Sequence, residues 1–190
     1  MPITPVNLTA SILAGLAGSG FTGQSLPTLA SGVGNGVAQW VSALTVVTTD
    51  VGTGGAGTGI LPWLVPQPVL LANMLAAYAG NSHIGMNAAQ EATGIATGLA
   101  TGFAQGLITT IHPTVGTGAG TVLKITGAPA ISFLLAGFAS VGIKGESAAK
   151  KANAISQALD QTLAVSILVV PIVGPTAPYA SSGAGFGRIV

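Results

Sequence analysis

The sequence predicts a single, mainly α-helical domain with short β segments, built from three internal repeats. Three observations support this: segments that align without gaps, helical spacing of apolar residues within them, and β-branched and glycine-rich stretches after each. Each repeat is expected to be an α-hairpin followed by an extended arm and a Gly-rich loop. The expected boundaries within the 190 residues are about 9–68, 69–130 and 131–190.

The first helix of each repeat is predicted from three segments of equal length. They are SILAGLAGSGFTGQS from Ser11, NMLAAYAGNSHIGMN from Asn73 and FLLAGFASVGIKGES from Phe133. In the first segment Ile12 and Leu16 lie four positions apart, which places them on one helical face. The other two segments carry apolar residues at the same places.

The end of each segment predicts a turn into a second helix. A glycine there is expected at the C′ position, in the left-handed region, and these glycines are Gly23, Gly85 and Gly145. A polar residue two positions later is expected to be the N-cap of the next helix, and these residues are Ser25, Asn87 and Ser147. Each segment is therefore expected to form an α-hairpin with the helix after it.

The second helix of each repeat contains small residues at every fourth position. Such a ridge allows another backbone to approach closely. We expect packing or interface positions at Gly34, Ala38, Gly94, Gly98, Gly102, Gly106, Ala154 and Ala158. Since each glycine costs a helix about 1 kcal/mol relative to alanine, close tertiary or intersubunit contact is expected to offset that cost.

Extended arms are predicted after each hairpin, where β-branched residues accumulate. The arms are 45–51, 107–115 and 166–173. Pro113 and Pro171 restrict two of them to edge or irregular strands, because proline cannot donate to a β ladder. The glycine-rich stretches VGTGGAGTGI from Val51 and VGTGAGTV from Val115 are predicted to be connecting loops.

The chain contains very few charged residues. Five Lys and Arg and four Asp and Glu make up 5% of the sequence, against roughly 25% in an ordinary globular domain. No charged residue precedes Asp50. A surface with so few charges is expected to be covered by other protein or by lipid. The near-neutral charge and sparse aromatic residues argue against a nucleic-acid partner.

No catalytic, cofactor-binding or metal-ligating residue is predicted, so the chain is expected not to be an enzyme. GSGFTG at 18–23 has the glycines of a dinucleotide motif, but a helix precedes it and no acidic residue follows before Asp50. The loop at Val51 lacks the Lys-Ser/Thr of a P-loop. His83 and His112 are the only histidines and the chain has no cysteine, which is too few ligands for a metal site. An Asp50–His112 contact is interpreted as a satisfied pair rather than a catalytic dyad.

Most of the charge lies in one segment, GIKGESAAKKANAISQALD from Gly142. The simpler interpretation is a helix with a solvated outer face, with Glu146 placed favourably at the positive end of the helix dipole. A docking surface for a partner is the alternative.

Membrane insertion is the second hypothesis for the whole chain. A spanning helix needs about 20 consecutive apolar residues. The apolar stretches 68–80, 131–143 and 163–170 are shorter, and aromatic belts and flanking basic clusters are missing. A small membrane-embedded or membrane-perforating protein, of pore, holin or ejection type, remains the alternative.

The segments GVAQWVSALTVVTTDVGTGGAGTG and GIATGLATGFAQGLITTIHPTVGTGAG each run from a helix into a Thr/Val arm and a Gly-rich loop. In this succession of segments, and in its cysteine-free, Ala/Gly/Thr-rich composition, the chain resembles virion structural proteins of tailed bacteriophages, of the tail, baseplate or neck type. The resemblance covers most of the chain and has no diagnostic motif. It implies a non-enzymatic, homo-oligomeric structural subunit in the assembled virion, with copies of itself and other virion proteins as partners and no cofactor.

Overall fold

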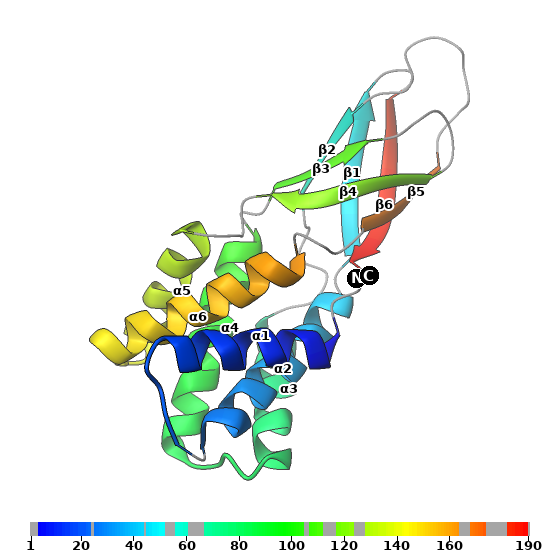
Figure 1. Cartoon of the computed structure of the whole chain (residues 1–190). Coiled ribbons are helices and arrows are strands. Elements are labelled where there is room, and N and C mark those ends of the chain that lie inside the picture. Colours follow the sequence, from blue (N-terminus) through cyan, green and yellow to red (C-terminus); the bar gives the residue numbers. More distant parts are fainter. Residues whose placement is uncertain are drawn as a thin grey trace.

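The computed structural model describes residues 4–23, 25–43, 45–51, 56–60, 67–104, 107–111, 117–123, 128–163, 168–173 and 182–189. Within these residues the chain forms helices and strands in alternating pairs. The helices are α1 (Pro5–Gly18), α2 (Ser25–Ala43), α3 (Gln67–Gly80), α4 (Met86–Ala104), α5 (Ala128–Ser140) and α6 (Glu146–Leu163). They form a helical body, and the strands lie together at one end of it (Figure 1).

The first helix of each hairpin, that is α1, α3 and α5, ends in the same hydrogen-bonded turn. In α1 the N–H of Gly20 donates to the carbonyl of Ala17 at 3.0 Å and that of Phe21 to Leu16 at 3.1 Å, which is a Schellman motif. The motif places its C′ residue in the left-handed region, and the residues there are Gly20 (φ 85°), Ser82 (φ 59°) and Gly142 (φ 82°).

The predicted caps are therefore wrong in position. Gly23, Gly85 and Gly145 do have positive φ, but they precede the second helix of each hairpin rather than end the first. The carbonyl of Gly85 accepts the N–H of Ala89 at 3.1 Å, which makes Gly85 the residue before the first helical turn. The predicted N-caps Ser25, Asn87 and Ser147 consequently lie inside α2, α4 and α6. The pattern identified the turn but not which of its two positive-φ residues ends the helix.

The six helices close into a ring around one core. α1 packs against α2 and α6, α3 against α2 and α4, and α5 against α4 and α6. The outer helices α1, α3 and α5 bury one residue in every four. These residues are Leu8, Ile12, Leu16, Leu70, Met74, Tyr78, Ala130, Leu134 and Phe138. The side chains of α2, α4 and α6 are buried over much more of their circumference, so these three helices occupy the interior.

The strands pair into a closed barrel in chain order. They are β1 (Thr45–Val51), β2 (Ala56–Ile60), β3 (Leu107–Ile111), β4 (Thr117–Leu123), β5 (Leu168–Val173) and β6 (Ser182–Ile189). All neighbours are antiparallel, and β1 closes the barrel by pairing with β6, with Thr48 opposite Gly185. The ladder between β5 and β6 pairs Val169 with Arg188 and resumes at Ile172, passing over Pro171, which has no N–H to donate.

The predicted fold class is wrong. The sequence predicts a short arm and a Gly-rich loop within each of three repeats of a single domain, whereas the structure pairs the strands of all three segments in one barrel. Residues of the two Gly-rich stretches expected in loops form β2 and most of β4. The hairpins are not independent repeat units either, because each outer helix also packs on the neighbouring hairpin and all six helices share one core. A glycine-rich segment has too few side chains to reveal that its backbone is paired.

Glycines let the outer helices approach the inner ones at backbone distance. A Cβ placed on Gly98 of α4 would lie 2.6 Å from the carbonyl oxygen of Phe133 and 2.8 Å from Cα of Leu134. One on Gly137 of α5 would overlap the carbonyl oxygen of Gly94. On the other side of the body, a Cβ on Gly34 of α2 would lie 2.8 Å from Cα of Thr9. These three contacts leave no space for a larger residue.

We expect Gly98→Ala to destabilise the helical body by about 1–3 kcal/mol, because the methyl group would force α4 and α5 apart and the gain in helix propensity is only about 1 kcal/mol. Gly80→Ala is the matched control, since nothing lies within 4 Å of a Cβ at that position. Chemical denaturation monitored by circular dichroism measures both. Equal midpoints for the two variants would contradict the close contact.

Candidate functional site

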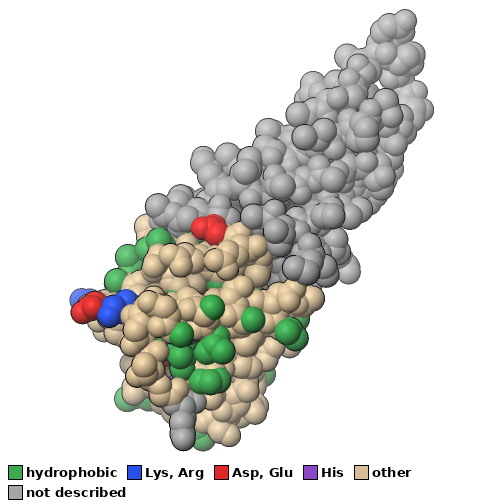
Figure 2. Space-filling view, in the orientation of Figure 1, with side chains coloured by type: hydrophobic (Ala, Val, Ile, Leu, Met, Phe, Trp, Pro, Cys, Tyr) green, Lys and Arg blue, Asp and Glu red, His purple; other side chains and the backbone are tan. Residues whose placement is uncertain are grey.

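Charge on the helical body is concentrated around the start of α6. Lys144, Glu146, Lys150 and Lys151 lie within eight consecutive positions, in the α5–α6 turn and the first turns of α6. Figure 2 shows the Lys side chains of this face gathered at one corner of the helical body. By contrast, α1, α2 and α3 contain no charged residue.

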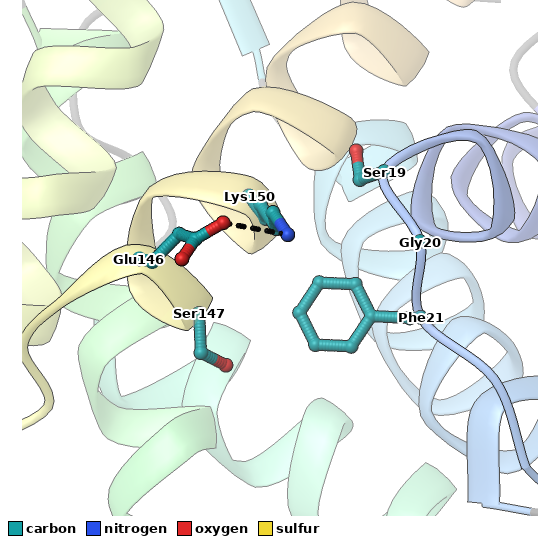
Figure 3. Close-up of a pocket in the computed structure, with 6 residues that line it drawn as sticks. All are labelled: Ser19, Gly20, Phe21, Glu146, Ser147 and Lys150. Carbon is teal, nitrogen blue, oxygen red and sulfur yellow. Dashed lines mark ion pairs between the residues drawn. The ribbon is translucent and has the colours of Figure 1, made fainter.

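A pocket of about 200 Å³ opens at this corner, between α6 and the α1–α2 turn. Phe21 projects its ring into the pocket from the turn, opposite Glu146, Ser147 and Lys150 (Figure 3). Ser19 and Gly20 complete the lining. The turn carries Phe21 to this place because the Schellman motif ends α1 just before it.

The pocket combines an aromatic wall with an ion pair. Lys150 Nζ lies 2.8 Å from Glu146 Oε1, and both side chains are well exposed. The hydrogen bond from Lys150, helped by its charge, lowers the pKa of Glu146. The Ser19 hydroxyl is already engaged, since it donates to the Gly15 carbonyl at 2.9 Å. The arrangement suits contact with a side chain or small polar group better than chemistry, because Lys150 and Glu146 already satisfy each other.

A second ion pair lies inside the body. Lys151 Nζ donates to Glu91 Oε1 at 2.7 Å, and the two side chains are 19% and 9% exposed. This pair joins α4 to α6 across 60 positions of sequence. A carboxylate buried to this degree needs such a partner, because removing the partner leaves an uncompensated charge in a poorly solvated place.

Tyr78 lies near the end of α3, and His83 follows in the α3–α4 turn. His83 follows the Schellman turn and packs its ring on Tyr78, with centroids 4.8 Å apart and planes at 87°. Burial raises the pKa of Tyr78 well above 10.0, and the charge of Glu91 raises it further. His83 thus makes the packing contact that an apolar residue ordinarily makes at this position of a Schellman motif, against the side chain five positions earlier.

The remaining predicted packing positions fall mostly inside the body. Ala38, Gly102, Ala154 and Ala158 are buried. A Cβ on Gly15 would lie 3.1 Å from that of Ala154, so α1 and α6 meet there. Gly106 lies outside the described residues. The described contacts of these positions are made within the chain.

The other motifs of the sequence do not form a site. Residues 18–23, with the dinucleotide-like glycines, form the end of α1 and its turn, with no strand ahead of them. Asp50 is in β1, and its side chain and His112 lie outside the described parts. Among the described side chains, no three His, Asp or Glu residues come together as a metal site would require. No described helix is both long enough and apolar enough to cross a membrane.

Comparison of the chain with protein-family models, curated proteins and solved structures finds no match.

Two features of this region escaped the sequence analysis. Phe21 and Lys150 meet only because α1 packs on α6, and no local pattern encodes that contact. The Glu91–Lys151 pair did leave a signal. Both residues begin their aligned segments, EATGIATG and KANAISQA, so opposite charges at one aligned position indicated that these helices could pair there.

We expect Lys151→Met to destabilise the protein by about 3–5 kcal/mol, because it leaves the Glu91 carboxylate buried without a partner. Lys150→Met removes the same charge from the exposed pair with Glu146 and should change stability little, since water solvates that carboxylate. Thermal and urea unfolding of the two variants test the difference. A smaller loss for Lys151→Met than for Lys150→Met would contradict the burial of the inner pair.

A second expectation concerns alkaline pH. Because folding raises the pKa of Tyr78, its contribution to stability is complete below pH 10.0 and is lost as the pH rises beyond it, when only the unfolded state ionises readily. Tyr179, the other of the two tyrosines in the sequence, is replaced in both proteins so that it does not titrate. Urea midpoints between pH 8 and 11.5 should therefore fall more steeply for Tyr179→Phe than for the Tyr78→Phe/Tyr179→Phe double variant. Parallel curves would show that Tyr78 ionises normally.

Proposed function

We propose that the chain is a non-enzymatic structural subunit of a large protein assembly, and that the assembly is a tailed-phage virion. The observation that carries the proposal is the uncharged exterior of the outer helices. Among the residues whose burial is described, the exposed ones on these helices are Pro5, Val6, Ala10, Ala14, Ala17, Gly18, Pro68, Val69, Ala72, Leu75, Ala76, Ala79, Gly80, Ser132, Leu135, Ala136, Ala139 and Ser140.

Such faces are unusual for a protein that stays alone in water. The surface of a soluble domain is ordinarily about 25–35% charged, and the exposed faces of its helices carry much of that charge. Alanine-lined helices instead allow a neighbouring helix to approach closely. These faces lack the charged side chains that water solvates well, so contacts with other subunits would cover them.

Exposed apolar side chains at both ends of the helical body add support. Val6 at the start of α1 is 76% exposed. Ile84 and Met86, around the α3–α4 turn at the opposite end, are 77% and 75% exposed. Contacts between successive subunits would cover both ends, as in head-to-tail assemblies.

The virion assignment rests on the resemblance to tailed-phage structural proteins in composition and in the succession of helix, Thr/Val arm and Gly-rich segment. Under this proposal the partners are copies of the chain and other virion proteins, and the chain resides in the assembled particle. The pocket at Phe21 and Lys150 lies on the charged corner and is available for such contacts.

Fractionation tests the proposal. The native material is expected to sediment as a large complex that resists mild detergent. Clean extraction by detergent, with no large complex, would contradict it and favour the membrane-embedded alternative.

Charge placed on an outer helix supplies a sharper version of this test. We expect Ala76→Glu to reduce the sedimenting fraction strongly while leaving thermal unfolding of the monomer almost unchanged, because position 76 is exposed in the isolated chain. Gln157→Glu adds the same charge to the exposed, already polar face of α6 and serves as the control. Normal assembly of Ala76→Glu would show that α3 does not face a partner.

A further inference from the structure

The two ends of the helical body carry opposite charges that no ion pair neutralises. Most charged side chains of the described parts belong to the two ion pairs made by α6. The remaining two are Lys144, exposed in the α5–α6 turn, and Asp160, near the end of α6 at Leu163. Because an α-helix rises about 1.5 Å per residue, α6 holds them roughly 20 Å apart. They therefore cannot pair with each other within one chain.

Asp160 occupies an unfavourable position for a carboxylate. Its Oδ1 atom is buried and has no hydrogen-bond partner among the described residues, although the residue as a whole is only half-buried. The C-terminal end of a helix carries a partial negative charge, which disfavours a carboxylate and favours a cation. Since buried polar groups in native proteins are nearly always paired, Asp160 calls for a cation that the described part of its own chain does not supply.

The exposed apolar side chains at the end remote from the strands are not required by the turn that carries them. The residue that follows the Schellman motif is Ile84 in the α3–α4 turn, but Thr22 and Lys144 in the other two turns. The same backbone thus forms with a polar residue at this position. The 77% exposure of Ile84 and the 75% exposure of Met86 are therefore better explained by a contact outside the chain.

We propose that copies of this chain join head to tail, with Lys144 of one copy paired with Asp160 of the next and Ile84 and Met86 packed near its exposed Val6. The start of α1 and the end of α6 both lie where the helical body meets the strands (Figure 1), and the two helices pack on each other, so one neighbour can reach Val6 and Asp160 together.

The charges favour this polarity over its alternatives. Joining two remote ends would bring two Lys144 side chains together, and joining two strand ends would oppose two Asp160 carboxylates. The head-to-tail contact joins different surfaces, so it repeats along a row of subunits. The inference rests on the proposed assembly and specifies which ends of the chain meet in it.

Charge reversal with complementation tests the proposal. Lys144→Glu and Asp160→Lys each oppose like charges at the contact, so each alone should weaken self-association in sedimentation about tenfold or more at low salt. In an equal mixture of the two variants, alternating copies join opposite charges again at every contact. The mixture should therefore sediment as the unmodified chain does. Normal assembly of either variant alone, or a mixture that assembles no better than the single variants, overturns the proposal.

A milder variant separates the contact from folding. Asp160→Asn keeps the shape of the side chain and removes its charge. It should weaken assembly, while the thermal midpoint of the dissociated chain stays unchanged or rises, because the carboxylate has no described partner there and lies at the negative end of α6. A lowered midpoint would show that Asp160 is paired within its own chain and would overturn the proposal.

The outcome for the unmodified chain distinguishes this contact from the proposed function. If the unmodified chain forms no large complex, the proposed function fails and this contact fails with it. If it does form one, and the charge-reversed variants join it equally well, only the head-to-tail contact is overturned.

Discussion

The backbone contact between α4 and α5 is the constraint on which the helical body depends. Gly94, Gly98 and Gly137 face one another so closely that any Cβ at Gly137 would occupy the place of a carbonyl oxygen. A separation fixed by backbone atoms cannot relax in the way that a contact between flexible side chains can. Gly34 and Gly36 set the same kind of limit where α2 meets α1 and α3. Since the helices close into a ring, each fixed separation restricts all the others.

This constraint explains how helices rich in glycine remain stable. Each glycine lowers intrinsic helix stability by about 1 kcal/mol, and close packing offsets the loss because more atoms reach van der Waals distance. Large side chains also meet in the interior, where Trp40 of α2 packs on Phe103 of α4 edge to face with centroids 5.0 Å apart. The Glu91–Lys151 pair occupies the same interior, and its length of 2.7 Å depends on the spacing of α4 and α6.

Features that depend on residues close together in the sequence were predicted correctly. Features that depend on contacts between distant residues were not. Apolar residues at Ile12 and Leu16 correctly indicated the buried face of α1, because helical periodicity is local. The Gly-rich segment at Ala56–Ile60 was interpreted as a loop, although it pairs with β1 and β3, because pairing is decided by partners far along the chain. The pocket could not be predicted for the same reason, since Phe21 and Lys150 are far apart in the sequence and are brought together by the packing of α1 on α6. The fold class was wrong because neither the local patterns nor the alignment of the three segments shows which strands pair.

Small residues line the exposed faces of the outer helices as well as the contacts inside the body. Inside the body, glycines allow backbones to touch, and the exposed faces of α1 and α3 present alanines outward at Ala10, Ala14, Ala72 and Ala76. Burying these faces in lipid would be only weakly favourable, since the methyl group of an alanine contributes far less apolar area than the leucine or phenylalanine of a lipid-facing helix. A protein surface can gain more, because alanines let a neighbouring helix pack closely, as Ala154 of α6 does against Gly15 of α1. The proposed assembly therefore requires no interaction that the chain does not already use to fold.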